Sequence, residues 1–238
     1  MTNNPEQPTP WRISVITLMP EMYPGPLGHS LVGEALTRRI WELTLVNLRD
    51  FGIGPHRKVD DSPAGGGAGM VLKPDVVDAA ITHAQQSNPA AQLIHFSPRG
   101  ERMNQPLLRE LSQTPLILLC GRYEAVDERV LEKHAPREVS LGDFVLTGGD
   151  IPAMALIDGC VRLLPGVVGK EASLGEESFG DGVYANLLEY PHYTKPAVWE
   201  GREIPEVLLS GHHAHIAQWR LAQAQAITAR KRPDLLKK

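Results

Sequence analysis

The sequence predicts an α/β protein in which a parallel β-sheet carries helices on both faces. Two observations support this prediction. Apolar runs of strand length alternate with amphipathic segments of helix length through roughly the first 165 residues. The run 115–120 (PLILLC) contains no polar alternation, which is typical of a strand at the buried centre of a parallel sheet.

Strands and helices follow one another in a regular order along this part of the chain. We expect strands at 12–18, 44–48, 92–96, 116–120 and 138–141. The spacing of apolar residues predicts helices at 31–41, 76–86, 105–111, 126–133 and 153–164. Because neighbouring parallel strands need a crossover connection, this order favours a helix-covered sheet.

The pattern changes after Leu164. Residues 165–195 are rich in Gly, Pro, Ser and acids without a sustained period, which predicts a linker or an ordered loop. An apolar patch at 206–209 precedes a predicted helix at 213–230, whose apolar side chains lie broadly on one side: Ile216, Trp219, Leu221 and Ile227. We therefore expect four parts: a disordered tail (1–10), the α/β domain (11–164), the linker (165–195) and a small helical domain (196–238).

Composition and charge limit the functional classes. The chain has 42% hydrophobic and 22% charged residues, as ordinary soluble proteins do. No apolar run has the length of a membrane span, and the polar, proline-rich first ten residues do not resemble a signal peptide, so we expect a cytoplasmic protein without membrane contact. The two cysteines, Cys120 and Cys160, lie in apolar segments without the spacing of a zinc or redox pair, and we expect buried thiols.

Charge is distributed unevenly along the chain. The formal net charge is -4, but the segment from Lys195 onward has eight Lys or Arg against four acids. This basic segment could contact a polyanion, or it could be a solvated helix end, and charge alone does not separate the two.

Glycine-containing turns follow three strands of the predicted sheet, after residues 96, 120 and 141. The first, Ser97-Pro98-Arg99-Gly100, suits a type I turn. Carboxyl ends of parallel strands lie at one edge of a sheet, where α/β proteins bind their ligands. Glycine also allows a ligand to approach the backbone closely, so the three turns predict a shared pocket for a small, flat molecule.

Other motifs are less specific. The run 65–70 (GGGAGM) lacks the lysine of a phosphate-binding loop and the spacing of a dinucleotide fingerprint, which leaves a lid or a plain mobile loop. Arg162 is the only cation between Ile151 and Val168, so it faces solvent, pairs with an acid or serves a site. The run 212–215 (HHAH) lacks ligand spacing on one helix face, and the sequence predicts no metal site.

Several blocks, taken in order, resemble bacterial tRNA (guanine-N1)-methyltransferases of the SPOUT superfamily. They are GGGAGM, SPRG, LLCGRYEAVDERV, SLGDFVLTGGDIPAMALIDGCVRLLPGV, KEAS, EESF, EYPHYTKP and LLSGHHAHIAQWR, and they cover nearly all of residues 11–236. The third and fourth blocks are the most specific.

This resemblance implies a fold and a reaction. Members of the family methylate N1 of the guanosine at position 37 of tRNA, beside the anticodon, and S-adenosylmethionine is the methyl donor. Their sheet contains a deep trefoil knot, they act as obligate homodimers, and they depend on Mg²⁺, which nothing in the sequence locates. The small helical domain is then expected to bind tRNA.

The resemblance also assigns residues to the cofactor. The loops after residues 96, 120 and 141 match the family's knot, which holds S-adenosylmethionine in a bent shape. The matching residues are Gly121, Leu141, Gly142, Asp143, Phe144, Val145 and Leu146, with Ser97, Pro98, Tyr123, Glu124, Gly148, Gly149 and Pro152 around them. Backbone groups can bond the adenine edge, and apolar side chains among these residues can cover its faces.

Two further residues match the family's catalytic positions. Guanine N1 carries a proton, so methylation needs a base, and it needs a cation near O6, where negative charge develops. Arg162 matches the arginine proposed as that cation. Glu177, in the run 176–179 (EESF), stands where the family usually has an aspartate as the base, and it keeps the carboxylate on an arm longer by one methylene.

Three alternatives remain. A catalytically weak or inactive SPOUT RNA-binding protein would have lost turnover through Glu177. Another SPOUT enzyme acting on a different RNA is disfavoured by the PHYT and HHAHIAQWR blocks, which resemble this family's own tRNA-facing module. An NAD-dependent oxidoreductase is disfavoured because the chain lacks the GxGxxG spacing. His212, His215 and Ala217-Gln218 depart from the family pattern, which leaves the strength of tRNA contact open.

Overall fold

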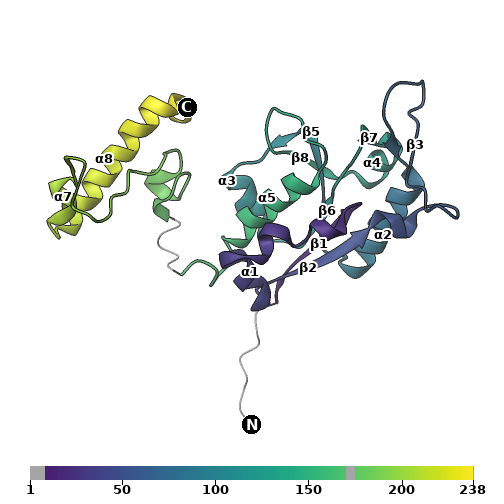
Figure 1. The fold of residues 1–238 in the computed structure, drawn as a ribbon, viewed down its shortest axis with the longest axis horizontal. Coiled ribbons are helices and arrows are strands. Elements are labelled where there is room, and N and C mark those ends of the chain that lie inside the picture. The colour runs from purple at the N-terminus through teal and green to yellow at the C-terminus, as the bar shows by residue number, and fades with distance from the viewer. Residues whose placement is uncertain (1–8, 170–174, 238) are drawn as a thin grey trace, which may run out of the picture. The chain divides into compact units, whose positions relative to one another are not determined.

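The structure is a computed structural model that describes residues 9–169 and 175–237 (Figure 1). The chain divides into two compact units, Met1–Val168 and Gly169–Lys238. Most of the predicted tail, 1–8, lies outside the described residues, as does the KEAS block at 170–173.

The first unit is built on a five-stranded sheet of order β2-β1-β6-β5-β8. Every neighbouring pair in it is parallel, which confirms the predicted sheet type. Its strands are β1 (Trp11–Thr17), β2 (Trp41–Asn47), β5 (Gln92–Arg102), β6 (Leu116–Leu119) and β8 (Arg137–Ser140).

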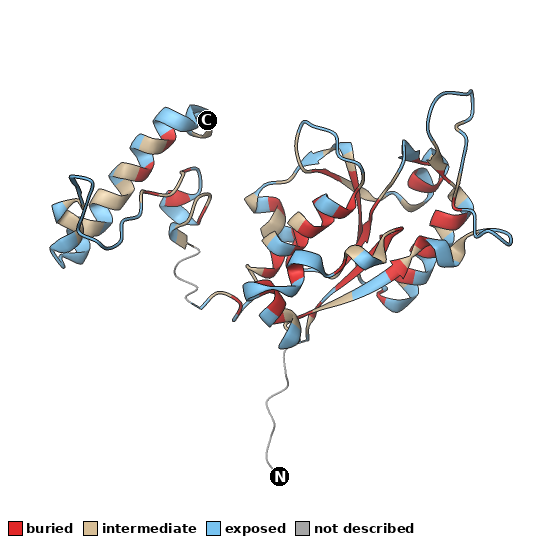
Figure 2. Cartoon of the chain, in the orientation of Figure 1, coloured by how far each residue is buried: buried red, intermediate tan, exposed pale blue. Residues whose placement is uncertain are grey.

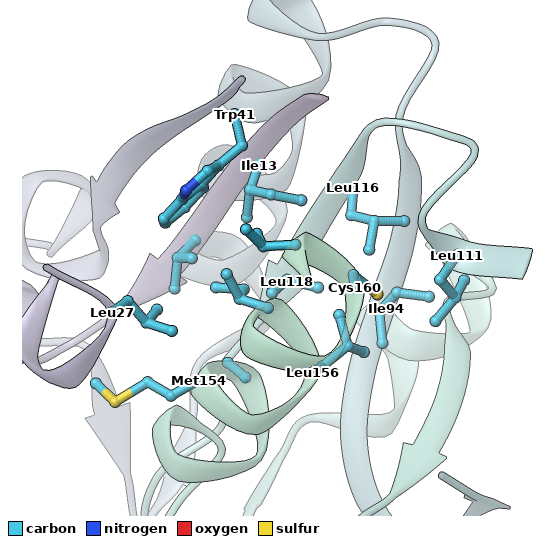
Figure 3. Close-up of a cluster of buried hydrophobic side chains, with 14 of the residues drawn as sticks. Ile13, Leu27, Trp41, Ile94, Leu111, Leu116, Leu118, Met154, Leu156 and Cys160 are labelled. Atoms are coloured by element: carbon cyan, nitrogen blue, oxygen red, sulfur yellow. The ribbon is translucent and has the colours of Figure 1, made fainter. Parts of the chain in front are cut away.

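Helices cover both faces of this sheet, also as predicted. They are α1 (Ser30–Thr37), α2 (Pro74–Ser87), α3 (Gln105–Leu111), α4 (Glu128–His134) and α5 (Asp150–Val161). Side chains of α1, α3 and α5 pack on one face with Leu116 and Leu118 of β6. Those of α2 and α4 pack on the other face with Ile117 and Leu119. Figure 3 shows the first of these cores, and Figure 2 shows buried residues concentrated along the sheet.

Local chemistry fixes several helix starts. The Asn104 side chain accepts a hydrogen bond from the Leu107 N–H and caps α3, and Asp127 caps α4 by accepting from the Arg129 N–H. Pro152 lies inside the first turn of α5, where a helix needs no N–H donor, so α5 begins before the proline and not after it as expected.

Two local expectations differ from the structure. Strand β2 begins at Trp41, within the expected helix, because Arg39 adopts a positive φ of 58° and the buried Trp41 indole donates to the Val32 carbonyl over 2.9 Å. Residues 97–100 form no turn that ends β5. Phe96 and Glu101 both lie opposite Val139 of β8, so the segment between them bulges from a continuous strand.

A small second sheet and short 3-10 helices complete the first unit. The sheet joins β3 (Asp60–Asp61), β4 (Val71–Leu72) and β7 (Ala125–Val126) in that order. It brings the glycine-rich run 65–70, between β3 and β4, to the segment that follows β6, because β4 pairs with β7. The 3-10 helices are η1 (Pro20–Met22), η2 (Gly25–Gly28) and η3 (Leu48–Phe51).

The second unit contains α7 (Glu206–Leu209), α8 (His213–Lys231), a hairpin of β9 (Val198–Trp199) and β10 (Arg202–Glu203), and the 3-10 helices η4 (Gly182–Tyr184) and η5 (Pro233–Leu236). Tyr184, Leu187 and Tyr190 form a buried cluster with Ala224 of α8. The Leu188 N–H donates to the Thr228 hydroxyl over 2.8 Å. The later part of the expected linker therefore supplies the core of this unit.

Candidate active site

A cavity of about 400 Å³ lies at the carboxyl ends of β6 and β8 and beside the bulge in β5. Its walls come from the three segments that follow or interrupt these strands: the bulge at 97–99, the loop 121–125 and the loop 141–149. The expected meeting of the three segments at one sheet edge is therefore seen, although the first of them is a bulge and not a turn.

Most of the residues that the resemblance assigns to the cofactor line this cavity. They are Ser97, Pro98, Gly121, Tyr123, Glu124, Leu141, Gly142, Phe144, Val145, Leu146, Gly148, Gly149 and Pro152. Asp143 does not line it. Its side chain is 83% exposed and pairs with Arg102 at the surface.

Two of the loops are joined through their backbones at the floor of the cavity. The Gly149 N–H donates to the Gly121 carbonyl over 2.9 Å, and Arg122 forms a β-bridge with Gly148. A Cβ on Gly149 would lie 2.8 Å from the Cα of Cys120, closer than a real Cβ comes. Glycine at 149 therefore allows the loop 141–149 to close against the end of β6.

A buried polar network lies beneath these loops, and no sequence motif indicates it. Asp150 is fully buried, and its Oδ2 accepts from the Arg122 guanidinium at 2.9 and 2.6 Å. Its Oδ1 accepts from the Thr17 hydroxyl at 2.6 Å and the Tyr23 hydroxyl at 3.3 Å. The network ties the loop after β6 to the start of α5 and to the end of β1. Nothing in the spacing of residues 17, 23, 122 and 150 marks them as partners.

Burial keeps two titratable side chains near these loops uncharged. Desolvation lowers the pKa of His95, which lines the cavity, so its ring is neutral at pH 7. Desolvation also raises the pKa of the Cys120 thiol, which is consistent with the buried thiol that the sequence predicts. His95 consequently brings no charge to the lining of the cavity. At the outer wall, Phe144, Val145 and Leu146 are exposed apolar side chains.

The glycine-rich run 65–70 reaches the edge of the cavity wall. The Glu124 N–H donates to the Met70 carbonyl over 3.0 Å, and Gly69 lies against the Glu124 side chain. The run thus contacts a segment that lines the cavity, which favours the lid interpretation over a loop remote from the site.

The two predicted catalytic residues lie in different units. Arg162 is the half-buried residue that ends α5 in the first unit. Glu177 is half-buried in a turn of the second unit, where its carbonyl accepts from the Gly180 N–H over 2.8 Å.

In the ranges 9–169 and 175–237, no group of three or more His, Cys, Asp and Glu side chains is arranged to hold a metal ion. No helix in this part of the chain is both long and apolar enough to cross a membrane.

Comparisons with known proteins agree on one family. Residues 11–238 match the family model described as tRNA (Guanine-1)-methyltransferase TrmD. A protein of Ruegeria pomeroyi named tRNA (guanine-N(1)-)-methyltransferase is 56% identical over 237 residues, which cover 99% of this chain and 96% of that protein. A protein of the same name from Rhodospirillum rubrum is 55% identical, over 94% of this chain and 92% of that protein. Another, from Gluconobacter oxydans, is 53% identical, over 94% of this chain and 94% of that protein. The chain therefore belongs to the tRNA (guanine-N1)-methyltransferase family.

Proposed function

We propose that this protein transfers a methyl group from S-adenosylmethionine to N1 of the guanosine at position 37 of tRNA. The observation that carries the proposal is the cavity between the three loops, in a chain that belongs to this methyltransferase family. Its volume of about 400 Å³ lies in the range of small-molecule sites. Relatives that match nearly the whole chain are named for the same reaction.

The lining of the cavity fits the methyl donor. Leu141, Leu146 and Pro152 offer apolar contact to a flat base, and the closely approaching backbone of the loops offers N–H and C=O groups to its edge. The neutral ring of His95 suits an uncharged adenosine. Glu124, on the wall, is a carboxylate of the sign that suits a positively charged sulfonium.

The chemistry is then divided between the donor and the protein. When bound, S-adenosylmethionine would supply an electrophilic methyl group, whose bond to sulfur breaks as N1 attacks, and S-adenosylhomocysteine would leave. Glu177 accepts the proton of guanine N1, which frees the nitrogen lone pair to attack that methyl. The guanidinium of Arg162 stabilises the negative charge that develops on O6 as the proton leaves. The basic segment from Lys195 onward contacts the tRNA backbone.

The remaining features of the family extend the proposal. A trefoil knot is supported by the closure of the loop 141–149 against the end of β6. A homodimer follows from the family resemblance. Dependence on Mg²⁺ follows from the family resemblance alone, and no step of the chemistry is assigned to the metal. A place in the cytoplasm stays the expectation drawn from the sequence.

Substitution of Glu177 tests the base. Glu177→Gln keeps the shape of the side chain but cannot accept a proton, so we expect turnover to fall by at least about 100-fold. Affinity for S-adenosylmethionine should stay near the wild-type value, because Glu177 does not line the cavity. Turnover is measured as transfer of radiolabelled methyl to tRNA with guanosines at positions 36 and 37, and affinity is measured by calorimetry.

The control substrate is the same tRNA with adenosine at position 37, which should accept no methyl. Near-wild-type turnover of Glu177→Gln would contradict the assignment of the base. Absence of methyl transfer by the unaltered protein would instead favour the alternative of an inactive RNA-binding member.

A further inference from the structure

Glu176, which precedes the proposed base, is held by two side chains of the second unit. Its Oε2 accepts a hydrogen bond from the Tyr190 hydroxyl over 2.9 Å. The same oxygen pairs with Nη1 of Arg220, on α8, at 3.3 Å. The Glu176 carboxylate is thus held by two donors from other segments of the unit.

Arg220 and Tyr190 also contact each other. The guanidinium carbon of Arg220 lies 4.8 Å from the centre of the Tyr190 ring, which is cation–π geometry. Burial and the bond to Glu176 raise the pKa of Tyr190 to about 12, so its hydroxyl stays protonated and donates at physiological pH. The three side chains form one cluster from three separate segments of the unit.

Backbone hydrogen bonds fix the turn that carries Glu177. Its carbonyl accepts from the Gly180 N–H, and the Phe179 N–H donates to the Leu187 carbonyl over 2.9 Å. The Ser178 hydroxyl accepts from the Glu189 N–H over 2.9 Å. A Cβ on Gly180 would lie 2.8 Å from the Glu177 carbonyl oxygen, so the turn closes tightly. Within this turn, a shift of Glu176 therefore moves Glu177 as well.

We propose that Glu176, Tyr190 and Arg220 are positioning residues, which anchor the turn to α8 and so set the place from which Glu177 accepts the guanine proton. The inference rests on the proposed role of Glu177. Glu176 then has a structural role, whereas Glu177 transfers the proton. Helix α8 then supports the base, in addition to its expected part in contacting tRNA.

The test uses the full chain and three variants. Tyr190→Phe removes the hydroxyl that holds Glu176, Glu176→Gln removes the charge that Arg220 pairs with, and a third chain carries both changes. The rate of methyl transfer in a single turnover is measured at saturating tRNA and S-adenosylmethionine. Affinities for both ligands and thermal unfolding are measured alongside. Tyr184→Phe is the matched control, because it removes a hydroxyl from the same buried cluster.

Each single variant should lose about tenfold or more in the single-turnover rate, because a small misplacement of a reacting group is costly. Ligand affinities should be unchanged. The double variant should lose no more than the worse single variant, since both changes break one contact. Tyr184→Phe should keep the wild-type rate. Folded single variants with wild-type rates, additive losses in the double variant, or losses confined to ligand affinity would overturn the inference.

Glu177→Gln in the same assay separates this inference from the proposed function. If Glu177→Gln is inactive while the cluster variants are normal, the base assignment stands and the positioning role fails. If Glu177→Gln is active and Glu176→Gln is inactive, Glu176 is itself the base, and both proposals fail. Should Tyr190→Phe unfold, the half-exposed Glu176→Gln still decides the question.

Discussion

Asp150 shows how one buried carboxylate can organise a ligand cavity. Its two oxygens accept hydrogen bonds from Arg122, Thr17 and Tyr23, which come from three different parts of the first unit. Burying a charge is costly unless it is paired. Asp150 is fully buried, and the side chain of its partner Arg122 is only 16% exposed. Loss of one partner leaves the other charge buried, so the network is sensitive to change at either residue.

Asp150→Asn should therefore affect both stability and cofactor binding. The amide keeps the shape but leaves the Arg122 guanidinium without its counter-charge, and we expect a loss of about 3 kcal/mol in the free energy of unfolding. Affinity for S-adenosylmethionine should fall too, because Arg122 and Gly149 line the cavity on either side of the network. Urea unfolding and calorimetry measure the two effects.

Asp158→Asn is the control for this change. Asp158 is exposed on the same helix, α5, so removal of its charge should alter neither quantity by more than about 0.5 kcal/mol. An Asp150→Asn protein as stable as the wild type would show that the pair with Arg122 contributes nothing net to folding.

At the scale of elements, one acid connects the two helices that cover the same face of the sheet. Asp78 of α2 accepts from the Lys133 ammonium at 2.6 and 2.8 Å, and it contacts His134 Nε2 at 2.5 Å, both residues being in the last turn of α4. The hydrogen bonds from Lys133 and then His134 lower the pKa of Asp78 below its ordinary value of 3.8.

The sign of this shift predicts how stability depends on pH. Because the folded-state pKa lies below the unfolded-state value, the stabilisation is present above about pH 4 and is lost as the pH falls through the folded-state pKa. Asp78→Asn should thus lower the free energy of unfolding at pH 6 by at most about 1 kcal/mol, since the group is a third exposed. The difference from wild type should shrink toward pH 3.

Urea unfolding of both proteins between pH 3 and pH 7 measures that difference. A gap that grows as the pH falls would contradict the assigned sign. Asp75→Asn serves as the comparison. Asp75 is also on α2, but its carboxylate lies 4.0 Å from the ammonium of Lys73, so this ion pair is weaker.

Elements whose limits depend on local sequence were predicted well. Helix α3 has the expected bounds, because the capping residue Asn104 and the proline in its first turn mark it in the sequence. The start of β2 and the bulge in β5 were not predicted. Trp41 is placed by a distant hydrogen bond to Val32, and the bulge is defined only by pairing with Val139 of β8. Such tertiary contacts leave no periodic signal in the sequence.

At the scale of the whole molecule, the site likewise has parts that local sequence indicates and parts that only tertiary contacts define. The three cavity segments could be located because each contains glycine and adjoins a strand end of the sheet. The network around Asp150 could not be inferred, since its members are far apart in sequence and common in type. The core of the second unit was also missed, because Tyr184, Leu187 and Tyr190 lie in a stretch without periodicity.

The division into two units predicts separate responses to the two ligands. Every residue that lines the cavity belongs to the first unit, whereas Glu177 and α8 belong to the second. S-adenosylmethionine alone should therefore slow amide hydrogen exchange in the loops 121–125 and 141–149 and leave α8 at its ligand-free rate. Addition of tRNA should then protect α8 and the turn around Glu177, because RNA contact is assigned to the second unit.

Hydrogen exchange followed by mass spectrometry measures both steps. The Glu177→Gln variant should show the same protection by S-adenosylmethionine, because its cofactor binding is intact. Protection of α8 by S-adenosylmethionine alone would mean that cofactor binding is transmitted to the second unit before tRNA arrives.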